Sequence, residues 1–367
     1  MTDPIIDDRR ESRERPLRPR CTCISRRSDE TRRTTRSRHG RGLARAAVAS
    51  GLLFLVACGE RGPARRFLSI GTAGTGGLYY PIGGTLASLM SVRDSSRTFT
   101  AEVTGGSVEN IQRLMNGEMD LAFAIGTTIY EAYNGGQDFS TPQSSLRVVA
   151  PLYPNLTHVL VREGAGIESI ADLRGKRVSV GAAGSGTEQL ARQVLEAYGL
   201  GYDHVDEQYL SFTESGAALA DGAIDGAIIS VGIPASAVLE ATTTGRVRLL
   251  PIEGEAATTL LTSYPYYTAA TIPAGSYPRQ ETGLATVSVM NWVIAREDLE
   301  GVIVEAVLDV LAEEREALER AIEIANQIRL AMLHSSPIPL HPAASAWLSR
   351  KGEPVLRPDT AAGGGTL

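Results

Sequence analysis

The chain has 367 residues, of which 43% are hydrophobic and 21% charged, a composition typical of a globular protein with room for two domains. Its net charge of −6 is unevenly distributed: residues 1–57 hold 14 arginines and 7 acids, whereas the remainder holds 22 basic and 35 acidic residues, a net charge of −13. This negative body argues against nucleic acid as a partner, because phosphate backbones are bound by surplus lysine and arginine.

The arginine-rich segment ends in a short apolar run, "AAVASGLLFLVAC", which closes at Cys58. A membrane-spanning helix needs about 20 apolar residues, so the run is typical of a signal-peptide core. "LVAC" followed by glycine resembles a bacterial lipobox, which implies that residues 1–57 are a leader and signal peptide. Cys58 would then carry the lipid, residues 58–66 would form a tether, and the protein would be extracytoplasmic. An uncleaved anchor, a chance cysteine and a misplaced start site are the alternatives.

After the tether, strand and helix patterns alternate across glycine turns. Apolar runs and helical spacing predict strand, helix, strand, helix and buried strand, in that order, over residues 67–73, 78–92, 99–104, 105–120 and 121–125. Ser107 is placed to cap the second helix of this series. Such alternation favours parallel or mixed sheets with helices on both faces.

The same order recurs about 105 residues later. "RVSVGAAGSGTEQLARQVLEAYGL" predicts strand, glycine turn and helix, "DEQYLS" predicts a strand, and "SGAALADGAIDGAIIS" predicts helix, tight turn and strand. Gly117 and Gly222 hold equivalent turn positions before the acidic residues Asp120 and Asp225. We interpret the two series as pseudo-equivalent α/β lobes, with chance similarity between ordinary βα units as the alternative.

The remaining segments predict how the lobes connect. Residues 147–163 read as two apolar runs interrupted by Pro151, Tyr153 and Pro154, and we expect the chain to cross to the second lobe here. Residues 251–283 are expected to supply the return, before a strand over 286–295 and helical structure over 300–333. The predicted domains are therefore 67–152 plus about 270–367, and 153–269, with a cleft between them.

The glycine loops lack the signatures of enzymes. A phosphate loop needs lysine after its last glycine, and neither loop contains one; the G-x-G-x-x-G and G-x-S-x-G spacings are also absent. After Cys58 the histidines are 158, 204, 334 and 341, and no two have the spacing of metal ligands. We predict no catalytic residue, no metal and no cofactor.

Helix N-termini remain as candidate binding groups. Turns rich in Gly, Ser and Thr expose backbone N–H groups at the positive end of the helix dipole and hold anions without a charged side chain. Three such turns occur, at residues 75–77, 105–107 and 184–187, and they would face one another if the two lobes form a cleft. Tight βα connections without a ligand are the alternative for each loop.

Several stretches resemble, in order, the landmarks of one family. "IGTAGTGGLYYPIGG", "EVTGGSVENIQRLMNGEMDLAFA", "DLRGKRVSVGAAGSGTE", "YYTAATIPAGSYP" and "LHPAASAWLSRKGEP" are similar to segments of the TAXI-type solute-binding proteins of TRAP transporters. The resemblance implies a two-lobed periplasmic-binding-protein fold, type II-like, that closes about a hinge. It also implies delivery of a small carboxylate or amino acid, such as glutamate, to a membrane permease.

The resemblance also implies ligand-binding positions. They are Thr75, Gly76, Tyr79 and Tyr80 in the first loop, Gly106, Ser107 and Asn110 in the second, and Ser185, Gly186 and Thr187 in the third. Tyr153, in the crossing segment, is a further candidate. Near Gly126 the family commonly has an amide that this chain lacks, and Thr127 or Thr128 is the shorter substitute.

Three functions fit these observations. The first is a lipid-anchored transport receptor for a small anionic or zwitterionic solute, working with TRAP permease subunits. The second is a receptor of the same fold that presents its ligand to a sensor kinase, and the third is an enzyme acting on a small acid. The sequence offers no catalytic set for the third.

Overall fold

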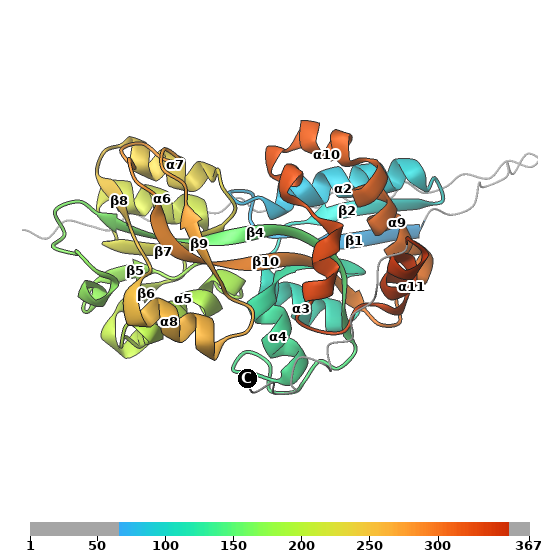
Figure 1. Ribbon diagram of the computed structural model, residues 1–367, viewed down its shortest axis with the longest axis horizontal. Coiled ribbons are helices and arrows are strands. Elements are labelled where there is room, and N and C mark those ends of the chain that lie inside the picture. The colour runs from blue at the N-terminus through green and yellow to red at the C-terminus, as the bar shows by residue number, and fades with distance from the viewer. Residues whose placement is uncertain (1–65, 352–367) are drawn as a thin grey trace, which may run out of the picture. The chain divides into compact units, whose positions relative to one another are not determined.

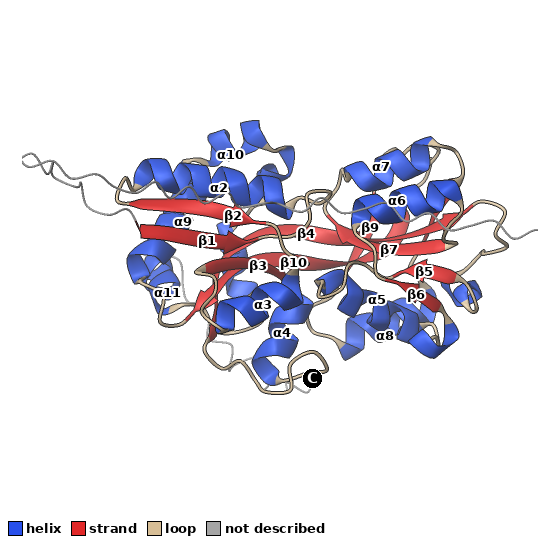
Figure 2. Ribbon diagram, turned by 180° about the vertical axis from the view of Figure 1, so that it is seen from behind, coloured by secondary structure: helices blue, strands red, loops and turns tan. Residues whose placement is uncertain are grey.

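The computed structural model describes residues 66–351, which lie within one compact unit of residues 62–367. Its strands form a single ten-stranded sheet with helices on both faces (Figures 1 and 2). The strand order is β2-β1-β3-β10-β4-β7-β5-β6, with β8 paired to β4 and β9 paired to β10. The predicted two-lobed α/β fold with a mixed sheet is confirmed.

The first lobe begins with β1 (Arg66–Gly71), α2 (Tyr79–Arg93), β2 (Arg97–Glu102), α3 (Ser107–Met115) and β3 (Leu121–Ile125). These strands are parallel in the order β2-β1-β3. All five residues of β3 are buried, as its uninterrupted apolar run predicts, because a central strand has helices on both faces. The expected order of elements is confirmed.

The second lobe repeats this arrangement with β5 (Arg177–Ser179), α5 (Gly186–Ala197), β6 (Asp206–Gln208), α6 (Phe212–Asp221) and β7 (Gly226–Val231). These strands are again parallel, in the order β6-β5-β7. The turn glycines Gly117 and Gly222 both adopt left-handed backbone, with φ of 79° and 75°, which only glycine adopts without strain. The pseudo-equivalence of the lobes therefore extends to topology and turn geometry.

Two long strands join the lobes. β4 (Leu146–Arg162) pairs with β10 (Leu284–Arg296) and then, over Leu156 to Val161, with β7 of the second lobe. β10 pairs first with β9 and then, from Asn291, with β3 of the first lobe. Residues 147–162 of the segment expected as two interrupted apolar runs thus lie in one continuous strand. The strand tolerates Pro151 and Pro154 because both lie before Leu156, where the pairing with β7 begins, and have β10 as their paired neighbour. The exact domain boundaries stay a prediction.

The other elements flank this frame. α4 (Gly126–Asn134) follows β3, and the second lobe adds α7 (Ser236–Thr243), β8 (Val247–Leu250), α8 (Gly254–Ser263) and β9 (Thr268–Ile272). The expected helical region after residue 300 resolves into α9 (Gly301–Glu313), α10 (Arg315–Ala321) and the 3-10 turns η3 (Glu323–Gln327) and η4 (Leu330–Ser335). Three further elements are α11 (Pro342–Arg350), η1 (Ile170–Leu173) and η2 (Tyr202–His204). Within residues 66–351, no helix combines the length and apolar character needed to cross a bilayer.

The helices divide between the two faces of the sheet in a way that matters for the site. In both views α2, α6, α7 and α10 cover one face, and α3, α4, α5 and α8 cover the other (Figures 1 and 2). The first helix of one lobe therefore lies on the same face as the second helix of the other lobe. Cys58, the expected lipidation site, lies outside the described residues.

Candidate functional site

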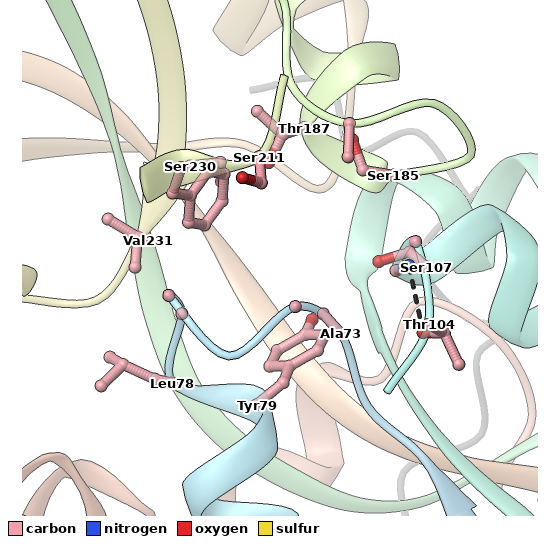
Figure 3. Close-up of a pocket in the computed structure, with 18 of the residues that line it drawn as sticks. Ala73, Leu78, Tyr79, Thr104, Ser107, Ser185, Thr187, Ser211, Ser230 and Val231 are labelled. Atoms are coloured by element: carbon pink, nitrogen blue, oxygen red, sulfur yellow. Dashed lines mark hydrogen bonds between the residues drawn. The ribbon is translucent and has the colours of Figure 1, made fainter. Parts of the chain in front are cut away.

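A cavity of about 410 Å³ lies between the lobes, within the range of about 300–1,000 Å³ usual for small-molecule sites (Figure 3). Its walls come from the loops that precede α2, α3, α5 and α6, and from β3, β4 and β7. The lining residues from these loops are Ala73 to Tyr79, Val103 to Ser107, Ala182, Ser185 to Thr187, and Ser211 to Thr213. The strands add Ile125, Tyr153, Asn155, Ser230 and Val231.

The loops before α3 and α5 touch across the cleft. The backbone N–H groups of Val108 and Glu109, at the start of α3, both donate to the carbonyl of Gly184 at 3.1 Å. A Cβ on Gly105 would lie 2.7 Å from the carbonyl oxygen of Ala183, closer than a real Cβ approaches backbone. Glycine at this position is therefore required by the close approach of the two lobes, which are closed on each other in this structure.

The loops before α2 and α6 form a second contact. A Cβ on Gly76 would lie 2.3 Å from the hydroxyl of Thr213, and one on Gly77 would lie 3.5 Å from the ring of Phe212. Each contact joins the first helix of one lobe to the second helix of the other. The two contacts are equivalent under the pseudo-symmetry of the lobes, and the cavity lies between them.

The electrostatics of the cavity come from the backbone. Four helices, α2, α3, α5 and α6, begin at its wall, and the first N–H groups of a helix have no acceptor within the helix. None of the described residues that line the cavity carries a formal charge. The N–H groups of Val108 and Glu109 are already bonded to the Gly184 carbonyl, and α3, α5 and α6 each have a glutamate in the first turn. The N–H groups that remain at these four N-termini are the groups that favour an anion in the cavity.

Hydroxyl groups provide further donors. Ser185 caps α5, because its Oγ accepts the Glu188 N–H at 3.1 Å, and its own proton stays free to donate. The expectation that Ser107 caps α3 is wrong: Gly106 holds the cap position, with φ of 123°, and Ser107 Oγ accepts the Ile125 N–H at 3.2 Å. Thr187 and Tyr153 are 6% and 1% exposed and line the cavity, and neither side-chain hydroxyl has a hydrogen-bond partner among residues 66–351.

A buried polar network supports the cavity floor from the joining strands. Tyr79 donates its hydroxyl to Asn291, whose amide donates to Asn155 Oδ1 at 2.8 Å. Asn155 in turn donates to the Ser230 carbonyl at 3.0 Å. Burial raises the pKa of Tyr79, so its hydroxyl stays protonated at physiological pH. The network connects α2 of the first lobe to β7 of the second through β10 and β4.

Nine of the twelve predicted ligand-binding residues line this cavity. They are Thr75, Gly76, Tyr79, Gly106, Ser107, Tyr153, Ser185, Gly186 and Thr187. Neighbouring residues of a helix point about 100° apart, so Tyr79 faces the cavity, whereas Tyr80 lies outside its lining and is 38% exposed.

Asn110 and Thr127 also lie outside the lining. Asn110 is buried and donates to the carbonyls of Thr72 and Phe123 at 2.6 and 2.8 Å, which holds the first glycine loop against β3. The hydroxyl of Thr127 is buried with no hydrogen-bond partner in the described part of the chain. Thr128 donates to Gln189 Oε1 at 2.8 Å, which adds a contact between α4 and α5. The ligand roles assigned from the family resemblance stay predictions.

Part of the cavity lining was not predicted from the sequence. The N-terminus of α6, with Ser211, Phe212 and Thr213, completes the second contact between the lobes. Its signal was the capping box "SFTE", in which Ser211 and Glu214 bond reciprocally. Asn155 and Asn291 were detectable as amide side chains within largely apolar strands, since a buried amide needs partners.

His158 lies in a buried, hydrogen-bonded environment. His158 is fully buried, with its ring nitrogens 3.0 Å from the Leu156 carbonyl and 2.9 Å from the Tyr277 hydroxyl. Burial lowers the pKa of His158 to about 4, so the ring is neutral at pH 7. Across residues 66–351, no group of three or more His, Cys, Asp or Glu side chains is arranged to hold a metal ion.

Several solved structures show a distant similarity to this chain. One solved structure is PhnD1 of Prochlorococcus marinus (MIT 9301) in complex with methylphosphonate, with 13% identity, 79% of this chain and 98% of that chain covered, and a TM-score of 0.49. Another is the periplasmic aliphatic sulphonate binding protein SsuA of Escherichia coli, with 18% identity, coverage of 78% and 90%, and a TM-score of 0.41. A third is an ancestral arginine-binding protein bound to arginine, with 15% identity, coverage of 71% and 98%, and a TM-score of 0.42. At these identities and TM-scores the likeness bears on neither ligand nor transporter.

The sequence itself gives a more specific assignment. The family model described as NMT1-like family matches residues 70–352, which span both lobes, both joining strands and α11. The match includes all four loops that form the cavity wall. The chain belongs to the NMT1-like family.

Proposed function

We propose that this protein is an extracytoplasmic solute-binding receptor, which captures a small carboxylate or amino acid such as glutamate by closure of its two lobes and delivers it to a membrane permease. The observation that carries the proposal is the convergence of four helix N-termini on one cavity whose described lining holds no charged residue. Backbone amides bind an anion without the desolvation cost of burying a cationic side chain.

The connection between the lobes supports reversible closure. Only β4 and β10 run through both halves of the sheet, so a small change in their backbone would rotate one lobe relative to the other. The two contacts between loops would then open together. Closure of this kind sequesters a solute and presents a distinct surface to a partner.

The type of transporter rests on the resemblance to TAXI proteins, which favours a TRAP permease driven by an ion gradient. The test is uptake of radiolabelled ligand into vesicles that hold the permease encoded beside this gene. Uptake that follows an imposed sodium or proton gradient supports a TRAP permease, and uptake that requires ATP contradicts it.

Binding itself is tested by thermal unfolding of the purified protein with a panel of carboxylates and amino acids. A ligand that binds only the native state stabilises it by about 2.7 kcal/mol at 100 times its Kd, so a binder raises the Tm by several degrees. If no small anion or zwitterion in a broad panel shifts the Tm, the receptor function is wrong.

The lipid anchor at Cys58 is a separate proposal. Cys58→Ser should move the protein from the membrane fraction to the soluble periplasmic fraction, because a thioether-linked lipid would no longer form. Continued fractionation of Cys58→Ser with membranes would contradict the lipobox, and the wild-type chain is the control.

A further inference from the structure

We infer that the solute is an aliphatic monoanion: a compound with one anionic head group, a short hydrocarbon tail and no ammonium group. This inference rests on the proposed receptor function and narrows its ligand class to compounds with a single anionic group, which excludes amino acids. It follows from the charge, the unpartnered donors and the polarity of the cavity.

An ammonium group would find no counter-charge in the cavity. Four glutamates lie within two residues of the lining in sequence, and each is outside it. Each carboxylate already accepts a hydrogen bond: Glu102 from Arg113 at 2.7 Å, Glu109 from the Gly105 N–H at 2.7 Å, Glu188 from Arg192 at 2.7 Å, and Glu214 from the Ser211 N–H at 2.9 Å. Because a buried cation without a partner is costly, an α-ammonium group lowers affinity here.

Hydroxyl donors are available where an anion would bind. Besides the helix N-termini, Thr187 lines the cavity and is 6% exposed, and its hydroxyl has no hydrogen-bond partner within residues 66–351. Ser185 Oγ accepts the Glu188 N–H, so its proton is available to the ligand. Both residues stand at the start of α5, which opposes the start of α3 across the cleft. This end of the cavity fits an anionic head.

The opposite end, at the starts of α2 and α6, carries more apolar side chains, with Ser230 among them. Figure 3 shows Leu78 and Val231 across the cavity from Ser107 and Ser185. Leu78 and Phe212 pack against the hydrophobic cluster of the second lobe, to which Val231 belongs. A hydrocarbon tail directed from the α3 and α5 termini would replace water on these side chains, and each buried methylene would tighten binding by about fourfold.

The experiment compares matched ligands on the purified wild-type protein by isothermal titration calorimetry. Pentanoate and norvaline share a carbon chain and a carboxylate and differ by the α-ammonium group. We expect pentanoate to bind at least tenfold more tightly than norvaline, and Kd to fall about fourfold per methylene from propanoate to pentanoate. Pentane-1-sulfonate tests whether the head group is restricted to carboxylate, and binding of either head supports the inference. Pentylammonium should not bind.

Thr187→Val tests the head-group end, because it removes the hydroxyl and keeps the shape. We expect it to weaken pentanoate binding about tenfold or more, since hydrogen bonds to charged groups are the strong ones. Thr242→Val is the control: Thr242 is also buried in the second lobe, but its hydroxyl bonds the Val238 carbonyl within α7, away from the cavity. Its affinity should equal that of wild type.

The outcomes distinguish failure of the monoanion inference from failure of the receptor function. Norvaline or glutamate binding as tightly as pentanoate overturns the monoanion inference and leaves the receptor function standing. An affinity unchanged by Thr187→Val and by chain length also overturns it. Failure of every anion and zwitterion to bind overturns the receptor function itself.

Discussion

The two lobes have the same topology, yet they hold their central strands differently. In each lobe an aspartate that opens the third strand accepts the N–H of a neighbouring strand: Asp120 from Ser69 at 2.9 Å, and Asp225 from Arg177 at 3.2 Å. Ser69 immediately precedes Ile70, which pairs with Leu121, and Arg177 immediately precedes Val178, which pairs with Gly226. The two aspartates therefore accept hydrogen bonds at equivalent positions of the strand register in the two lobes. Only Asp225 also receives two arginines, Arg162 and Arg177, at 2.9 and 3.0 Å.

This difference follows from strand length. β1 and β2 of the first lobe have six residues each and pair along their full length, whereas β5 and β6 have three. Shorter strands form fewer backbone hydrogen bonds, and the second lobe adds two ion pairs at its aspartate. The first lobe has its ion pairs elsewhere, from Arg66 of β1 and Arg97 of β2 to Glu300. The two lobes therefore have the same topology but different interactions at the aspartate. Variants that remove these interactions one at a time test the comparison.

The largest expected effect concerns His158, a buried histidine on the part of β4 that pairs with the second lobe. Its pKa of about 4 in the folded protein lies below the unfolded value of about 6.5, so the unfolded state binds more protons between these values. Stability is fully present above pH 6.5 and is lost as the pH falls towards 4, by about 3 kcal/mol. Urea unfolding at pH 7.5, 5.5 and 4.5 measures this loss.

His158→Gln is the matched variant, because glutamine keeps hydrogen-bonding groups and does not titrate in this range. The loss of stability between pH 6.5 and 4 should be smaller in His158→Gln by about the same 3 kcal/mol. Equal pH dependence in the two proteins would show that His158 does not stay neutral in the fold.

The aspartate clamps give the next largest effect. Asp225→Asn removes the charge that two arginines share, and we expect a loss of about 2–3 kcal/mol in the free energy of unfolding. Asp120→Asn keeps an oxygen that can accept the Ser69 N–H and removes only the charge of this acceptor, so it should cost about 1 kcal/mol or less. Chemical denaturation of both variants checks the ranking, and equal losses would contradict the role given to the arginines.

The two loop contacts differ in the atoms that a Cβ added at Gly105 or at Gly76 would meet. Gly105→Ala places Cβ 2.7 Å from the backbone of the opposite lobe, whereas Gly76→Ala meets mainly the hydroxyl of Thr213, which can rotate away. Overpacking of the first kind costs about 1–3 kcal/mol, so Gly105→Ala should weaken ligand binding about ten- to hundredfold. Gly76→Ala should change it by less than about threefold, and the reverse order in calorimetry would mean that the α2 and α6 contact controls closure.

The smallest effect separates capping from binding at Ser185. Ser185→Ala removes the cap of α5 and should cost about 1 kcal/mol of stability. Ser169→Ala removes the serine of the capping box at η1, at an exposed residue outside the cavity lining, and is the control. We expect only Ser185→Ala to weaken ligand binding as well, and unchanged affinity would mean that Ser185 is a helix cap alone.

Much of the site was predictable because its parts are local. The glycine loops and the burial of residues 121–125 depend on neighbours in the chain. Thr75, Ser107 and Thr187 were assigned to the site because each stands at the turn between a strand and a helix, and in parallel sheets such turns meet at one edge. Asn110 was assigned from the family resemblance, but its amide turns inward to the carbonyls of Thr72 and Phe123.

The sequence by itself determined two βα series with glycine-rich turns, since turn geometry, capping and apolar periodicity act over a few residues. Only the tertiary structure decided which turns meet, because the pairing of α3 with α5 and of α2 with α6 depends on how β4 and β10 set one lobe against the other. It also decided that Tyr79 rather than Tyr80 faces the cavity, and that Asn155 and Asn291 join beneath it. Contacts between residues far apart in the chain have no local signal, and the selectivity of the cavity depends on them.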